Sequence, residues 1–148
     1  MLHRKLLIVA LLSLPGWRGN SQDGVHTGGI SLDDLLPGIA WAESRSHPSR
    51  HSYLGPEYGR GLYGVSEDCL AHFNQVHGSN WKPNDLYSPH VNRVVARWYL
   101  GWLDQYYTRH PDRLRRVLSA YNQGWRATDR WGVNNECVDN VLTNRSRN

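Results

Sequence analysis

Apolar residues recur at intervals of three and four along most of this chain, which predicts a mainly helical protein. The most regular stretch follows Ser88 and Pro89, a typical helix start. Its apolar positions are Val91, Val94, Val95, Trp98, Trp102 and Tyr106. Because this is the strongest periodic pattern in the chain, we expect it to form the central buried helix.

The same spacing predicts four further helices. A capping box at Ser31 and Asp34 begins the first, whose apolar positions extend to Ile39. Pro37 lies within it, so either this helix begins late or two helical pieces meet there. The expected limits of the others are Ser66 to Gly78, Asp112 to Gly124, and a short C-terminal segment containing Val138, Val141 and Leu142.

Residues 52–64, between the first two predicted helices, are rich in glycine, with aromatic and charged residues between. So many glycines exclude a regular helix. They favour either a close approach of a ligand to the backbone or a small irregular hairpin, and both fit the wall of a cleft. A phosphate-binding loop is not expected, because no strand precedes the segment and no Lys-Ser/Thr pair follows it.

Residues 1–22 are expected to be a secretory signal peptide or, if uncleaved, an N-terminal membrane tether. Basic residues precede an apolar run at 6–14 that is too short to span a bilayer. A polar, Gly-rich linker follows at 23–30, and residues 31–148 make up one domain. The protein is therefore expected to be secreted or periplasmic, with membrane contact only through an uncleaved leader.

The composition is unusual in its aromatic residues and in its charge. Seven Trp and eight Tyr stand against one Phe, and such rings suit a groove that stacks on sugars, although most are expected in the core. A formal net charge of +4 favours a polyanionic partner such as a bacterial envelope, phospholipid or nucleic acid. Six arginines form either a basic face for DNA or a merely solvated face. They are Arg93, Arg97, Arg109, Arg113, Arg115 and Arg116.

The two cysteines, Cys69 and Cys137, either form a disulfide in an oxidising compartment or are two unrelated buried thiols. His47 and His51 have the spacing of a helical zinc pair, but Pro48 lies between them and no accompanying glutamate is present. We therefore expect neither a metal nor another cofactor.

The strongest candidate for chemistry is Glu43, which follows a short apolar helical segment at 39–42. A carboxyl group at the end of such a helix is expected to be partly desolvated, which would raise its pKa. A raised pKa suits an acid that must keep a proton near neutral pH and donate it to a leaving-group oxygen. The alternative is a solvated glutamate at a helix end.

Four short motifs, in this order, resemble the soluble lytic transglycosylase domain, which is similar in fold to goose-type lysozyme. They are Glu43-Ser44, Gly61-Leu62 with Val65 behind it, the set Asn92, Ala96 and Tyr99-Leu100, and Ala120-Tyr121-Asn122-Gln123-Gly124. The resemblance covers residues 35–125. It implies a mainly α fold of the α+β lysozyme-like kind, with a cleft beside a long central helix and the Gly-rich hairpin in the cleft wall.

The resemblance also implies an activity, cleavage of peptidoglycan between N-acetylmuramic acid and N-acetylglucosamine to give 1,6-anhydro products. Glu43 matches the single catalytic acid. The residues matched to substrate binding and the cleft are Ser44, Gly61, Leu62, Tyr63, Tyr121 and Asn122. Ser44 either fixes the turn after the helix or contacts substrate, and the Tyr121 hydroxyl is hypothesised to reach Glu43.

One departure from the family pattern concerns Tyr63 and Gly64, which stand where the family usually has Met-Gln, so the glutamine is absent. Glu67 just downstream is either a second cleft carboxylate or, more simply, a first-turn residue favoured by the helix dipole.

Three other functions remain open: a hydrolytic muramidase, a non-catalytic peptidoglycan-binding protein of the same fold, and a nucleic-acid binder, which the leader argues against. The wider context is wall turnover, a secretion or conjugation apparatus, or phage lysis or entry.

Overall fold

The computed structural model describes residues 26–27 and 29–147, and the mainly α prediction is confirmed. Two very short strands, β1 (His26–Thr27) and β2 (Ile30–Ser31), pair antiparallel with Thr27 opposite Ile30, where the sequence suggested a linker. The helices that follow are α1 (Leu32–Ser44), α2 (Glu67–His77), α3 (Pro89–Tyr106), α4 (Arg113–Gln123), α5 (Trp125–Trp131) and α6 (Asn135–Asn144). Two 3-10 turns, η1 (Pro56–Tyr58) and η2 (Pro83–Tyr87), lie in the connections.

None of the helices in the described part of the chain is both long enough and apolar enough to cross a membrane. The apolar run of the expected leader lies outside the described residues.

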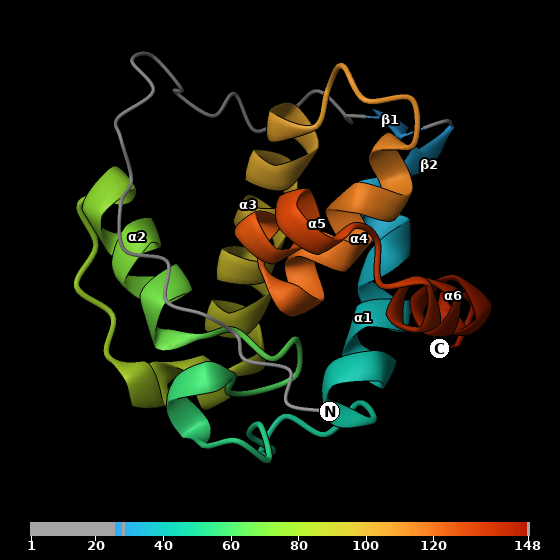
Figure 1. Ribbon diagram of the computed structural model, residues 1–148. Coiled ribbons are helices and arrows are strands. Elements are labelled where there is room, and N and C mark those ends of the chain that lie inside the picture. Colours follow the sequence, from blue (N-terminus) through green and yellow to red (C-terminus); the bar gives the residue numbers. More distant parts are fainter. Residues whose placement is uncertain (1–25, 28, 148) are drawn as a thin grey trace.

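Helix α3 is the central helix, as predicted, with α2 on one side and α1 and α6 on the other (Figure 1). Its fully buried face is centred on Asn92, Val95, Ala96, Leu100 and Leu103. The apolar stripe read from the sequence is therefore partly rotated: Val95 and Trp98 are buried, whereas Trp102 is only partly buried and Tyr106 is exposed. Large amphipathic rings fit the boundary of the core, where one part of the ring is buried and another meets water.

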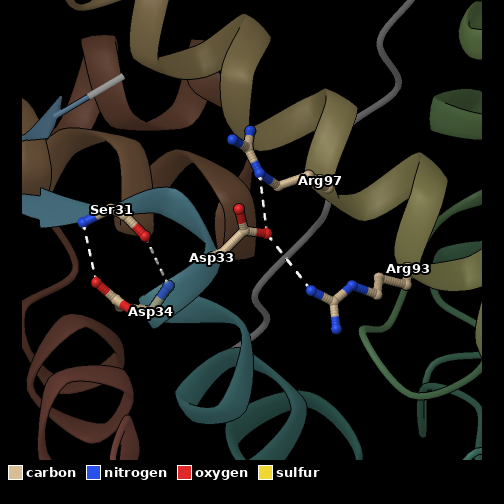
Figure 2. A network of polar contacts seen from close by, with 5 residues as sticks. All are labelled: Ser31, Asp33, Asp34, Arg93 and Arg97. Atoms are coloured by element: carbon tan, nitrogen blue, oxygen red, sulfur yellow. Dashed lines mark hydrogen bonds and ion pairs between the residues drawn. The ribbon is translucent and has the colours of Figure 1, made fainter. Parts of the chain in front are cut away.

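Helix α1 begins at the capping box expected from the sequence (Figure 2). The Ser31 hydroxyl accepts a hydrogen bond from the Asp34 amide at 3.3 Å, and the Ser31 amide donates to the Asp34 carboxylate at 3.2 Å. The neighbouring Asp33 contacts two arginines of α3, Arg97 at 3.2 Å and Arg93 at 3.5 Å. These contacts hold the first turn of α1 against the central helix.

Pro37 neither delays nor divides α1, because the helix is continuous from Leu32 to Ser44. Pro37 lacks an amide hydrogen, so the ladder loses one bond. Packing of α1 against α6 offsets this loss. The packing is so close that a Cβ atom on Gly38 would lie 2.1 Å from the Val141 carbonyl oxygen.

The Gly-rich segment forms the small irregular hairpin that the sequence suggested. Arg60 pairs antiparallel with both His51 and Val65, and η1 lies in the turn. Helix α5 was not expected. It begins directly after Gly124, which ends α4 as predicted, and its sequence has no regular apolar spacing.

We predict that Gly38→Ala destabilises the protein although alanine favours helix by about 1 kcal/mol. The new methyl group would overlap the Val141 backbone, and overpacking of this kind typically costs about 1–3 kcal/mol. Thermal unfolding would measure the change. Gly101→Ala in α3 is the control, because the nearest atom to its new Cβ would be Arg97 Nη1 at 3.7 Å. Equal stability of both variants would contradict the predicted clash.

Candidate active site

A large cleft opens beside the C-terminal end of α1, and Glu43 lies half-buried in its wall. The cleft has a volume of about 1280 Å³. It is bordered by the end of α1, the Gly-rich hairpin, the end of α4, helix α5 and the start of α6. Two stretches that are far apart in the sequence, 42–64 and 122–140, therefore form the cleft that holds this carboxyl group.

Asn122, 79 residues away in the sequence, contacts Glu43. Its side-chain amide donates a hydrogen bond to Glu43 Oε1 at 3.2 Å. Asn122 lies in the last turn of α4 and Glu43 in the last turn of α1, so the contact sets the relative position of these two helix ends. The sequence suggested that Glu43 lies beside the Tyr-Asn motif, and in the structure Asn122 makes this contact.

Gly64 approaches the same carboxyl group from the hairpin. A Cβ atom at this position would lie 2.7 Å from Glu43 Oε2, and the backbone has a positive φ of 61°. Glycine is therefore required twice here, once for the backbone conformation and once for space. This explains why the family's glutamine is not accommodated at position 64 in this backbone arrangement.

Asn92 on α3 holds the hairpin in place through its side-chain amide. Its oxygen accepts from the Tyr63 amide at 2.7 Å, and its nitrogen donates to the carbonyl groups of Arg60 and Leu86, both at 2.8 Å. Asn92 is fully buried, and a buried amide satisfied in this way fixes the backbone around it. A side chain on Gly61 would collide with Asn92 and with the Leu86 carbonyl.

Ser44 and Tyr121 also bind backbone. The Ser44 hydroxyl lies 2.8 Å from the Leu62 carbonyl and accepts from the His47 amide at 3.2 Å, and only 2% of Ser44 is exposed. This arrangement fits the turn-fixing alternative for Ser44. The Tyr121 hydroxyl donates to the Tyr63 carbonyl at 2.7 Å, in place of the hypothesised bond to Glu43.

Burial raises the pKa of Tyr121 well above its usual value, and the Glu43 carboxylate raises it further. The phenol therefore stays protonated, so it can donate its hydrogen bond to Tyr63.

The predicted site residues thus fall into two groups. Glu43, Gly61 and Asn122 line the large cleft. Leu62 packs against the core and the Tyr63 side chain is buried. Neither of these two side chains lines a described cleft, and both residues contribute backbone carbonyl groups instead.

A second hollow of about 300 Å³ adjoins the large cleft. Both are lined by Gly64, Asn122 and Gln123, so they meet beside Glu43. Glu67 borders the smaller hollow but forms an ion pair with Arg60, whose side chain is largely buried. Its carboxylate is therefore already bound to a cation within the fold.

The structure forms no disulfide between Cys69 and Cys137. Cys69 lies near the start of α2 beside the smaller hollow, whereas Cys137 lies in the first turn of α6 on the large cleft. Cys69 thus borders the smaller hollow and Cys137 the large cleft. The distance between two cysteines in the sequence does not show whether their side chains meet.

Several cleft residues were not anticipated. Tyr53 is 86% exposed and Trp131 is 62% exposed, and both line the cleft together with Arg45, Arg50 and Glu136. None of them belongs to an apolar repeat or to a recognisable motif. Tyr53 does lie in the Gly-rich segment 52–64, which the sequence suggested as a cleft wall. For Trp131, Arg45 and Arg50 the only sequence signal is the overall excess of Trp, Tyr and Arg, and Glu136 has none.

A model of the transglycosylase SLT domain matches residues 29–140. The chain belongs to the transglycosylase SLT domain family. Curated proteins and solved structures gave no significant match. Membership in the SLT family implies peptidoglycan as the substrate and a glycan-cleaving activity of the transglycosylase type.

We predict that Gly64→Ala lowers activity strongly, because the new methyl group would displace the Glu43 carboxyl group. Gly78→Ala is a matched control. Gly78 has a φ of 64° and nothing within 4 Å of its added Cβ, so both variants lose about 1 kcal/mol of stability from the backbone conformation. Turnover of peptidoglycan would be compared with thermal unfolding. Equal activity of the two variants would show that Gly64 acts through backbone conformation alone.

Proposed function

We propose that this SLT-family protein is a lytic transglycosylase that cleaves the β-1,4 bond between N-acetylmuramic acid and N-acetylglucosamine. The observation that carries the proposal is the position of Glu43, half-buried in a cleft of about 1280 Å³ and hydrogen-bonded to Asn122. Pockets of this kind, with few convergent polar groups, are the usual sites of ligand binding.

In the proposed mechanism, Glu43 acts first as an acid and then as a base. Its proton passes to the glycosidic oxygen as the bond to the anomeric carbon breaks, and the N-acetylglucosamine end leaves as an alcohol. The carboxylate then takes the proton of the muramic 6-hydroxyl as that oxygen bonds to the anomeric carbon. The 1,6-anhydro ring closes, Glu43 regains its proton, and no water is consumed.

One carboxyl group suffices for this sequence because the attacking oxygen belongs to the sugar itself. A hydrolase of the usual kind needs a second carboxylate, about 5 Å away for retention or about 6.5–9.5 Å away for inversion. Asn122 supports the proposed role of Glu43 by holding one of its oxygens. The close backbone of Gly64 limits the space around the other oxygen.

A hydrolytic muramidase is the second candidate, and one observation favours it. Glu136 at the start of α6 lines the same cleft as Glu43 and supplies a second carboxylate. The two reactions differ in their products, because hydrolysis adds one water and leaves a reducing muramic acid. A non-catalytic wall-binding protein would release no soluble fragments.

We further propose that the protein acts after export through its leader. The cellular setting would be wall turnover, a secretion or conjugation apparatus, or phage lysis or entry. The expected leader supports export.

We predict that the wild-type protein releases anhydromuropeptides from purified sacculi and that Glu43→Gln lowers this rate by at least about 100-fold, the usual size of a general acid contribution. Mass analysis of the soluble products would measure both the rate and the reaction type. Glu136→Gln is the informative control, because a transglycosylase retains its anhydro products without Glu136. Products heavier by one water, lost in both variants, would instead identify a hydrolase.

We predict that Trp131→Ala raises KM for glycan strands about fivefold, equivalent to about 1 kcal/mol of lost stacking, with little change in kcat. The ring is exposed in the cleft wall, where it offers a flat face to a sugar. Val76→Ala is the control, because Val76 is an exposed apolar residue of α2 that does not line the cleft. Steady-state kinetics on soluble strands would give both constants. An unchanged KM would remove Trp131 from substrate binding.

A further inference from the structure

Two arginines, Arg45 and Arg50, line the large cleft just beyond the helix that carries Glu43. Both side chains are exposed, and neither forms an ion pair with any acidic residue in the described part of the chain. The other charged residues of this cleft are Glu43 and Glu136, and His51 also lines it. Two arginine residues with no ion pair among the described residues thus line the cleft that holds Glu43.

Most of the arginines that the sequence suggested as a basic face form ion pairs elsewhere in the fold, and two of them share one aspartate. Their ion pairs are Arg93 and Arg97 with Asp33, Arg113 with Asp104, Arg115 with Asp139, and Arg116 with Asp112. Arg45 and Arg50 in the cleft wall are therefore among the arginines that lack a carboxylate partner in the described part of the chain. This distribution disfavours a nucleic-acid surface along α3 and α4 and favours an anionic group in the cleft.

The backbone at Arg45 has an unusual conformation. Arg45 and Ser46 are consecutive non-glycine residues in the left-handed region, with φ values of 54° and 61°. Such strain persists where the surrounding structure over-determines it, often at functional sites. The Arg45 guanidinium carbon lies 5.2 Å from the Trp41 ring centre, and that of Arg147 lies 4.3 Å from the same centre. Stacking on Trp41 limits where the Arg45 guanidinium can lie.

We propose that Arg45 and Arg50 bind carboxylate groups of the peptide stems carried by muramic acid, so that the cleft selects stem-bearing glycan. The inference rests on the proposed function, because it requires a peptidoglycan strand in the cleft. Guanidinium groups bind carboxylates through paired hydrogen bonds. The glycan backbone of N-acetyl sugars carries no charge of its own, so the charges of this substrate hang from the muramic acid residues. Arg45 is two positions beyond Glu43 in the sequence, and both residues line the cleft.

The experiment uses the full chain and three soluble, uncrosslinked substrates. The first is glycan strands with peptide stems. The second is the same strands with their stem carboxyl groups converted to neutral methylamides. The third is strands stripped of stems by an amidase, which keep only the lactyl carboxylate. The variants are Arg45→Gln/Arg50→Gln, the charge-retaining Arg45→Lys/Arg50→Lys, and the control Arg109→Gln. Arg109 is an exposed arginine outside the cleft, with no ion pair among the described residues.

We expect kcat/KM of the wild type and of Arg109→Gln to be about tenfold higher on stem-bearing strands than on the other two substrates, the size of one charge-assisted hydrogen bond. The Gln double variant should lose this preference and cleave the neutralised and stripped strands at the wild-type rate. The Lys double variant should keep part of the preference, which a folding defect would not produce.

Three results would overturn the inference. An equal loss on all three substrates would show that the arginines serve the glycan or the fold. A preference for stripped strands, lost in the Gln variant, would assign the arginines to the lactyl carboxylate. Equal cleavage of all three substrates by every variant would show that Arg45 and Arg50 do not bind the peptide stems, and it would leave the proposed function intact. Failure of the proposed function is distinct, because wild type and Glu43→Gln would then both leave every strand uncut.

Discussion

The buried amide of Asn92 is the interaction on which the geometry of the site depends. It joins the central helix to Tyr63, Arg60 and Leu86, three backbone positions of which two belong to the hairpin. A buried amide left without these partners would cost about 1–3 kcal/mol for each unsatisfied group, so the hairpin and α3 hold one another in register. From there the chain of contacts reaches the catalytic candidate, because Tyr121 binds Tyr63 and the next residue, Asn122, binds Glu43.

Residues of different family motifs contact one another in this arrangement. Ser44 and Leu62 come from different motifs, and they meet as a hydroxyl and a carbonyl group. Tyr121 and Tyr63 meet in the same way. The motif residues therefore fix the end of α1 against the hairpin, while Glu43 and Asn122 are left at the surface of the cleft. Ser44 and Tyr121, which the resemblance assigned to substrate binding, thus bind backbone carbonyl groups of the segment beside Glu43.

The sequence predicted those features that depend on neighbours in the chain. The capping box of Ser31, the glycine end of α4 and the central helix all follow from local spacing. The rotation of the buried face of α3 and the existence of α5 do not, because tertiary packing decides them. Likewise Ser44 and Tyr121 each contact a backbone carbonyl group that is distant in the sequence, 18 and 58 residues away. Because every residue has a backbone carbonyl group, the sequence does not show which one a side chain will bind.

The departure of the chain from the family pattern at position 64 is explained by the same constraint. The hairpin comes so close to α1 that a Cβ atom on Gly64 would touch both the Oε2 and the Cβ atoms of Glu43. The large cleft also meets the smaller hollow at this point. A glutamine side chain would have to occupy the junction or push the carboxyl group aside. With glycine here, the side-chain amide that contacts Glu43 comes from Asn122 in the last turn of α4. The Glu43 carboxyl group therefore keeps a side-chain hydrogen-bond partner although position 64 has no polar side chain.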